Sequence, residues 1–224
     1  MKPIIIFGTG KISEVIYYLF MNHSNREVIA FSIDDEYFED KEKYEKPIIK
    51  FSNLKEFYPP SEVDIFVGVG YQQLNKVREK IYKKLEKIGY ELVSFIHPDS
   101  GIPKDCIVGK NCMIMNNVCI HPKVSIGNNV FIWSGAVIGH HSKISDNCWI
   151  TSAANISGNV NVGKNCFFAI NSTISHSVNI GSQCFIGANT FISRCTNDCE
   201  VFIAERTKPY RLNSEQFIKM TNFQ

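Results

Sequence analysis

Hydrophobic residues follow two different patterns along the chain. In the first 97 residues, short apolar runs alternate with amphipathic stretches, which predicts strands over 3–7, 27–33, 64–69 and 91–96 and helices over 11–21 and 72–88. Alternation of strands and helices is typical of a parallel sheet built from right-handed βαβ units. We therefore expect an α/β domain over residues 1–97.

From Ile102 onward, every sixth residue is large and apolar. The sixteen anchor positions from Ile102 to Ile192 hold thirteen isoleucines, two valines and one phenylalanine, and the fourth residue after each anchor is small or β-branched. Strand alternation turns both of these positions inward. A six-residue period of this length predicts a parallel β-helix over residues 98–200, a triangular prism in which three hexads make one coil.

The prism needs a tight corner after each short strand. The third residue after the anchor is Asn in eight hexads, and the residue directly after the anchor is Gly in six. Both residue types tolerate the left-handed backbone that such a corner requires.

Cysteine positions fit the same pattern. Five of the eight cysteines occupy the inward small slot, where a thiol packs as a small hydrophobe, which argues against a disulfide framework and against a zinc site: Cys106, Cys112, Cys148, Cys166 and Cys184. Cys119, Cys195 and Cys199 lie outside that slot, and their role is not explained by it.

Charge supports a boundary at His97-Pro98. Residues 1–97 carry 29 charged side chains and residues 98–200 only 11, while residues 201–224 form a more basic C-terminal tail. The net charge of +2 argues against a nucleic-acid partner. With no apolar run of membrane-spanning length and no signal-peptide pattern, we expect a cytoplasmic protein without a membrane partner.

Residues eighteen apart stack on one another in a prism of this kind. One outward column holds five large apolar side chains: Met113, Phe131, Trp149, Phe167 and Phe185. An exposed apolar ladder is rare on a monomer, so this outward column predicts a subunit interface and a homo-oligomer.

A second column places His140 one coil from Gly158 and two coils, roughly 10 Å, from His176. A histidine beside a glycine whose amide is accessible offers a general base and an oxyanion donor, which are the groups that acyl transfer needs. The alternative interpretation is a solvated surface histidine.

The chain resembles the hexapeptide-repeat nucleotide-sugar acetyltransferases, which include bacillosamine-, viosamine- and perosamine-type N-acetyltransferases and related sialic-acid O-acetyltransferases. The resemblance covers nearly the whole chain and rests on the sixteen hexads and on four segments: Ile4–Gly10, Ile33–Asp35, Gly68–Tyr71 and Ser157–Phe167. It implies a left-handed coil, acetyl-CoA as co-substrate without a metal, and a homotrimer with active sites between adjacent prisms.

The resemblance also implies roles for individual residues. The family's catalytic histidine falls on His140, and the Gly158 amide would then be the oxyanion donor. Many relatives follow this histidine with Glu or Asp, whereas here the next residue is His141, which we expect to shape the pocket or contact the substrate. Acetyl-CoA is expected at Gly158 and Ala188 and at Arg206 and Lys208 in the basic tail, although a solvated C-terminal extension is an equal alternative for the tail.

The N-terminal loop Gly8-Thr9-Gly10 matches only two of the three glycines of a dinucleotide fingerprint, and 97 residues supply one Rossmann-like half domain. We therefore expect one nucleotide rather than NAD. The family uses this domain to bind the nucleotide of a nucleotide-linked sugar, and the resemblance places nine residues there: Gly8, Thr9, Gly10, Asp34, Asp35, Gly70, Tyr71, Asn75 and Arg78. For Arg78, an ordinary solvated helix residue is the alternative.

The leading functional hypothesis is an acetyl-CoA-dependent N-acetyltransferase that acts on a UDP- or dTDP-linked 4-amino-4,6-dideoxy sugar for surface-glycan synthesis such as lipopolysaccharide O-antigen. The alternatives are an O-acetyltransferase for sialic acid or another sugar hydroxyl, and a scaffold without catalysis that uses the prism only for assembly.

Overall fold

The computed structural model describes residues 1–221 and begins with a six-stranded sheet in the order β3-β4-β2-β1-β5-β6. All neighbouring strands are parallel except β3 and β4. The strands are β1 (Ile4–Phe7), β2 (Val28–Ile33), β3 (Glu42–Lys43), β4 (Lys46–Lys50), β5 (Asp64–Val67) and β6 (Glu91–Leu92). The helices of this part are α1 (Lys11–His23), the 3₁₀ turn η1 (Asp35–Tyr37), α2 (Phe51–Phe57) and α3 (Lys76–Ile88). The predicted α/β domain is therefore present.

Two features of this domain differ from the prediction. The elements between Asp35 and Phe57, namely η1, β3, β4 and α2, were not predicted; in β4, Pro47 and the flanking lysines hide the apolar run. α3 begins at Lys76 rather than at Gln72, because Gln73, Leu74 and Asn75 all have left-handed backbone, with φ of 51°, 51° and 66°. The extra loop lies at the edge of the cleft described below.

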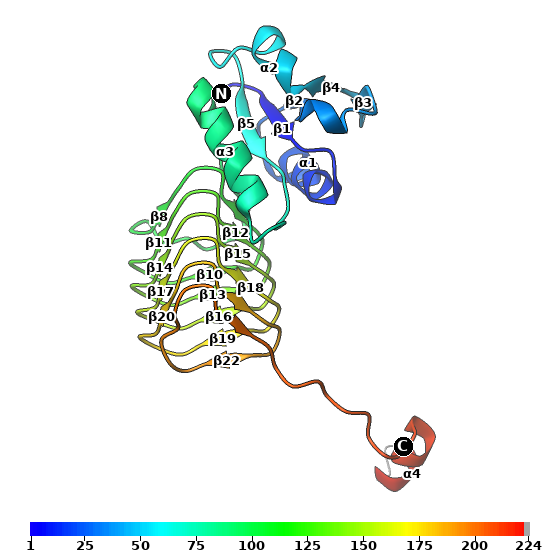
Figure 1. The fold of residues 1–224 in the computed structure, drawn as a ribbon, viewed down its shortest axis with the longest axis vertical. Coiled ribbons are helices and arrows are strands. Elements are labelled where there is room, and N and C mark those ends of the chain that lie inside the picture. Colours follow the sequence, from blue (N-terminus) through cyan, green and yellow to red (C-terminus); the bar gives the residue numbers. More distant parts are fainter. Residues whose placement is uncertain (222–224) are drawn as a thin grey trace.

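Residues 95–202 form the predicted parallel β-helix, whose two-residue strands stack in three sheets (Figure 1). The first face comprises β7 (Phe95–Ile96), β9 (Met113–Ile114), β12 (Phe131–Ile132), β15 (Trp149–Ile150), β18 (Phe167–Phe168), β21 (Phe185–Ile186) and β23 (Val201–Phe202). The second face comprises β10 (Cys119–Ile120), β13 (Val137–Ile138), β16 (Asn155–Ile156), β19 (Thr173–Ile174) and β22 (Phe191–Ile192). The third face comprises β8 (Ile107–Val108), β11 (Ser125–Ile126), β14 (Lys143–Ile144), β17 (Asn161–Val162) and β20 (Asn179–Ile180).

The register of the prism is eighteen residues per coil, as predicted. Phe131 pairs with Trp149, for example, and the anchors from Ile114 to Ile192 lie in one buried cluster. The third residue after the anchor has positive φ in every hexad from Asn111 to Asn189, whether or not it is asparagine. The backbone conformation of the corner is thus set by the coil, and the residue type follows it.

The boundary between the two parts lies a few residues before the predicted one. The predicted strand over 91–96 divides into β6, which belongs to the N-terminal sheet, and β7, which pairs with β9 on the first face. Val93 donates its amide to Ile65, whereas Phe95 donates to Cys112. The architecture therefore changes at Val93–Ser94 rather than at His97-Pro98.

The outward column of Met113, Phe131, Trp149, Phe167 and Phe185 is not an exposed ladder. Its first four members are buried, because the N-terminal domain packs on the first face and joins them in one apolar cluster with Phe20, Phe66 and Phe95. The prediction that this column is a subunit interface is wrong, since it forms the seam between the two domains of one chain. The homo-oligomer itself stays a prediction.

After β23 the chain leaves the prism as an extended segment that leads to α4 (Ser214–Thr221), which Figure 1 shows well separated from the coils. No residue of α4 is buried. Within residues 1–221, none of the helices combines the length and the hydropathy needed to cross a bilayer.

Candidate active site

A cleft of about 790 Å³ opens at the carboxyl ends of β1 and β5. The chain leaves β1 toward β2 on one side and returns on the other side as β5, so the cleft lies at the point where the strand order reverses, the usual ligand position in such sheets. We call it the sheet-end cleft. Six residues predicted from the sequence line it: Gly8, Thr9, Gly10, Asp34, Gly70 and Tyr71.

Two glycines let the loops of this cleft approach each other. Gly8 has φ of 116°, and a Cβ there would lie 3.0 Å from the Gly68 carbonyl oxygen. A Cβ on Gly68 would lie 3.2 Å from Cα of Ser13, in the first turn of α1. The N-terminus of α1, at Lys11, therefore lies at the cleft wall, where the Gly68 loop packs on the first turn of the helix. Unpaired amides at a helix N-terminus favour an anionic group.

The two aspartates after β2 have different surroundings. Asp34 lines the sheet-end cleft, and its Oδ1 lies 3.0 Å from Nζ of Lys84 on α3. Asp35 lies instead in an adjoining hollow of about 650 Å³, where its Oδ1 accepts the Ser52 amide at 3.0 Å. The hydrogen bonds from Ser52 lower the pKa of Asp35. Asp35 thus holds the start of α2 and does not line the cleft.

Arg78 and Asn75 were predicted to bind the nucleotide, and the structure contradicts both. Arg78 is completely buried and donates to Oδ1 and the carbonyl oxygen of Asn129 at 3.0 and 3.1 Å and to the Gly70 carbonyl oxygen at 3.1 Å. Its guanidinium also lies 4.4 Å from the ring centroid of Phe131. Asn75 is buried as well and donates to the Cys166 carbonyl oxygen. Neither is a solvated helix residue, because both fasten the N-terminal domain to the prism.

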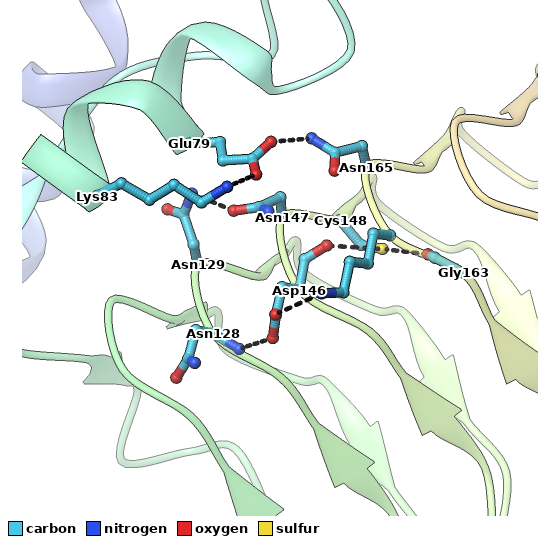
Figure 2. A network of polar contacts seen from close by, with 10 residues as sticks. Glu79, Lys83, Asn128, Asn129, Asp146, Asn147, Cys148, Gly163 and Asn165 are labelled. Atoms are coloured by element: carbon cyan, nitrogen blue, oxygen red, sulfur yellow. Dashed lines mark hydrogen bonds and ion pairs between the residues drawn. The ribbon is translucent and has the colours of Figure 1, made fainter.

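One corner of the prism provides the polar half of this seam. We call Asn111, Asn129, Asn147 and Asn165 the corner asparagines; all four are buried and lie between the third and first faces. Asn111 accepts the Val67 amide at 2.7 Å, and Asn165 donates to Glu79 at 2.9 Å. Figure 2 shows Glu79 and Lys83 of α3 above this ladder. The sequence predicts these asparagines only as corner residues, and the structure shows that they also hydrogen-bond to the N-terminal domain.

The prism carries the second group of predicted residues, at the corner between the second and third faces. His140 and His141 are exposed, and their Nδ1 atoms lie 3.1 Å apart. A Cβ on Gly158 would lie 2.6 Å from Nε2 of His140, so only glycine leaves room for this ring. The centroids of the His140 and His176 rings are 6.0 Å apart, closer than the coil spacing implies, because Gly158 in the coil between them has no side chain.

The Gly158 amide differs from the amides of Lys110, Asn128 and Ser182, which occupy the same hexad position at the corner between the third and first faces. Asn128 occupies the same hexad position and donates its amide to the Asp146 side chain one coil further on, at 2.9 Å. Within residues 1–221 the Gly158 amide has no such acceptor, because the residue one coil further on is His176. This N–H is therefore available to a ligand at the edge of the His140 ring.

The remaining predicted residues lie apart from this corner. Ala188 is exposed at the corner between the first and second faces, and Arg206 and Lys208 are exposed in the segment after β23. The structure of one chain does not bring them together with His140. Residues 1–221 contain no group of three or more His, Cys, Asp or Glu side chains placed to bind a metal ion.

Several cleft residues were missed by sequence reasoning: Lys11, Ile12, Tyr37, Gln72 and Gln73. Lys11 could have been found as the first helical residue after the glycine loop. Tyr37, Gln72 and Gln73 carry no such signal, because η1 and the left-handed loop before α3 bring them in.

Three family models match the sequence. The PglD N-terminal domain matches residues 3–85, the bacterial transferase hexapeptide model of six repeats matches residues 105–140, and the hexapeptide repeat of succinyl-transferase matches residues 159–194. A search of the curated proteins gave no match.

The fold is shared with solved acetyltransferase structures. A histidine-to-asparagine mutant of perosamine N-acetyltransferase from Caulobacter crescentus, in complex with CoA and GDP-perosamine, is 23% identical, with 91% of this chain and 94% of that chain covered and a TM-score of 0.82. The acetyltransferase domain of PglB from Neisseria gonorrhoeae is 20% identical, with 94% and 100% covered and a TM-score of 0.79.

At these identities the likeness shows the fold, and it confirms the predicted Rossmann-like domain followed by a left-handed parallel β-helix. The models divide the chain in the same way, since one matches the α/β domain and two match the prism. The chain therefore combines a domain similar to the PglD N-terminal domain with bacterial-transferase hexapeptide repeats, the two parts that its resemblance to the hexapeptide-repeat nucleotide-sugar acetyltransferases predicts.

Proposed function

We propose that this protein transfers the acetyl group of acetyl-CoA to the amino group of a nucleotide-linked 4-amino sugar, with His140 as the general base. The observation that carries the proposal is the exposed His140 ring, whose Nε2 lies over Gly158 next to an amide free of acceptors within residues 1–221. The Caulobacter crescentus neighbour, whose structure holds CoA and GDP-perosamine, supports this class of reaction.

The sheet-end cleft is the proposed site of the nucleotide. Its volume of about 790 Å³ suits a ligand of nucleoside-diphosphate size. The start of α1 beside Gly8–Gly10 offers amides to a phosphate group, and the Asp34 carboxylate at the end of β2 offers an acceptor to a sugar hydroxyl. We propose UDP or dTDP as the nucleotide, with GDP as the competing choice because the Caulobacter crescentus neighbour holds GDP-perosamine.

The proposed reaction uses the two groups at the His140 corner. The amine attacks the thioester carbonyl carbon and forms a C–N bond, while Nε2 of His140 accepts the proton that the nitrogen loses. The Gly158 N–H donates to the oxyanion of the tetrahedral intermediate. The C–S bond then breaks, and the CoA thiolate leaves and takes up the proton from His140.

The cleft and the histidine lie on different sides of one chain. Tyr71 at the cleft packs on Trp149 and Phe167 of the first face, whereas His140 lies at the corner between the second and third faces, opposite to it. A sugar held in the cleft therefore meets the His140 of another chain. We propose a homotrimer with each site between two prisms, in which Ala188, Arg206 and Lys208 contact acetyl-CoA.

The nucleotide is tested by calorimetric titration of the protein with UDP, dTDP and GDP. Tightest binding of UDP or dTDP is expected, and no binding of any of the three would contradict the role of the sheet-end cleft.

The reaction is tested by release of the CoA thiol with 4-amino sugars linked to the preferred nucleotide. Because a general base contributes about 10²–10⁴-fold, H140A and H140N should lower kcat by roughly 100-fold or more. Wild-type turnover by either variant would disprove the assignment, and turnover of hydroxy sugars alone would favour O-acetylation.

Oligomeric state is measured separately by light scattering at micromolar concentration, where a monodisperse monomer would exclude a site shared between chains.

A further inference from the structure

His141 lies next to the proposed base in the chain, at a corner where the backbone has φ of 60°. The equivalent position is asparagine in eight hexads, because asparagine tolerates this left-handed conformation best among the larger side chains. A histidine there gives up part of that local stability. Lys123, Ala153, Ser177 and Gln183 adopt the same left-handed backbone at equivalent positions, so the feature that distinguishes His141 is the contact of its side chain with His140.

The corner is fixed on both sides by neighbouring coils. The His141 amide donates to the Pro122 carbonyl oxygen at 3.2 Å, and the His140 carbonyl oxygen accepts the Asn159 amide at 2.8 Å. The next residue, Ser142, is buried and donates to the Ser157 carbonyl oxygen at 3.0 Å. The backbone that carries both imidazoles is thereby held in place.

The imidazoles meet through their Nδ1 atoms, 3.1 Å apart, with the rings nearly perpendicular at 85°. Such a contact is a hydrogen bond when one Nδ1 carries a proton and the other offers its lone pair. Two arrangements satisfy this condition. If His140 is the donor, its Nε2 is left with a lone pair above Gly158; if His141 is the donor, Nε2 of His140 carries the proton and cannot act as a base.

We propose that His141 is a positioning residue that accepts the Nδ1–H of His140 and so keeps Nε2 of His140 free to take a proton. The proposal rests on the proposed function, because it assigns the base to that atom. When Nε2 becomes protonated, the Nδ1–H bond to the neutral His141 persists and orients the imidazolium. A neutral imidazole supplies orientation and tautomer control without the negative charge of a carboxylate.

Few charged groups lie near the pair. His176 faces His140 from the coil two steps further on, and Lys123 precedes His141 by one coil with its Nζ 3.3 Å from Asp105. Asn159 and Ser177 follow in the same column as His141 and are hydrogen-bonded to each other at 2.9 Å. None of these places a carboxylate on either imidazole, since Asp105 binds Lys123.

Three substitutions of His141 separate these roles. Oδ1 of Asn or Asp is bonded to Cγ as Nδ1 of His is, so H141N keeps an acceptor at the same place and H141D adds a charge to it. H141A removes the acceptor while keeping a residue that the corner accepts, since Ala153 has φ of 57° at an equivalent position.

The tautomer is read by NMR of protein labelled with ¹⁵N-histidine, with His140 signals assigned from the H140N spectrum. We expect the proton on Nδ1 of His140 in the wild type and in H141N, and loss of that preference in H141A. A wild-type His140 with its proton on Nε2 would overturn the proposal. The spectra need no turnover, so they decide the proposal even if the proposed reaction is wrong.

Kinetics provide the second readout. We expect H141A to lower kcat about 10-fold with little change in KM, and H141N to recover most of that loss. In H141D, the acid limb of kcat should move to higher pH by about one unit, because a carboxylate stabilises the protonated imidazole. Equal kcat values and superimposable pH profiles for H141A, H141N and H141D would also overturn the proposal.

Discussion

Replacement of Arg78 tests whether the seam between the domains depends on one buried charge. R78M keeps a side chain of similar length but removes the guanidinium, which has no exposed surface and makes three hydrogen bonds, two across the seam to Asn129 and one to Gly70 of its own domain. Hydrogen bonds from a charged donor contribute about 1.5–3 kcal/mol each, so the three together contribute roughly 4–9 kcal/mol.

The opposing effect is desolvation of the charge. Burial lowers the pKa of Arg78 well below its ordinary value, to about 9, which leaves the side chain charged at neutral pH. At 1.36 kcal/mol per pKa unit, that depression corresponds to roughly 5 kcal/mol, and methionine removes this penalty. We therefore expect R78M to lower the free energy of unfolding by about 2 kcal/mol.

The sign of the pH dependence follows from the same shift. Because the folded protein holds the Arg78 proton less tightly than the unfolded chain, stability contributed at this site rises with pH above about 9 and is constant below it. Between pH 6 and 8 the difference between wild type and R78M should therefore not vary through this group.

Urea unfolding at pH 7 measures the difference, with K87M as the control because Lys87 is an exposed residue of the same helix. We expect K87M within about 0.5 kcal/mol of the wild type. Without urea, folded R78M should also bind the nucleotide several-fold more weakly. Gly70 lines the sheet-end cleft, and in this variant its carbonyl oxygen loses the hydrogen bond from Arg78. An R78M protein that is as stable as the wild type and binds as tightly would refute this account of the seam.

Three further predictions concern Gly158, the cysteines and the basic tail. G158A would place a Cβ 2.6 Å from Nε2 of His140 and displace the ring, so kcat should fall about 10–100-fold in steady-state assays while the melting temperature changes little; unchanged kcat would exclude the close packing described here. Burial raises the pKa of the Cys112 thiol to about 11, so a thiol reagent at pH 8 should label the exposed Cys119, Cys195 and Cys199 rapidly and Cys112 only after denaturation, as peptide mass mapping would show; rapid native labelling of Cys112 would contradict its burial. The double variant R206A/K208A should raise KM for acetyl-CoA roughly 3–10-fold with kcat unchanged, whereas an unaltered KM would mean that the tail is a solvated extension.

Periodicity predicted the prism well because its inward positions obey one rule. An anchor such as Ile150 packs against the coils above and below, so its environment depends only on its place in the repeat. The cysteines of the small slot follow for the same reason. The left-handed corner backbone could be predicted as well, including at His141, where the residue type gives a weaker signal than the register.

Outward positions could not be interpreted in this way. Alternation places Phe131 and Trp149 outside the coil, but nothing in the repeat says what covers them, and here the N-terminal domain does. The burial of Arg78 could not be predicted for the same reason. The amphipathic pattern of the helix shows that Arg78 lies on its polar face, but not whether that face contacts water or the buried asparagines of the prism. For the cleft, the glycine loops were predictable from local sequence, whereas Tyr37, Gln72 and Gln73 depend on tertiary folding.

The eighteen-residue coil restricts which length changes the gene can tolerate. Loss of a single codon between those for Ile102 and Ile192 would turn the later anchor residues of the prism toward solvent, because each would arrive one step early in its hexad. Insertion of eighteen codons would instead add one coil of about 4.8 Å and keep the strands of all three faces in register. A coil inserted after Ile192 would leave Arg78, the corner asparagines and His140 in their present positions. Whole coils can thus be added at this end of the prism without moving the sheet-end cleft or His140, whereas Arg206 and Lys208 would shift by one coil relative to them.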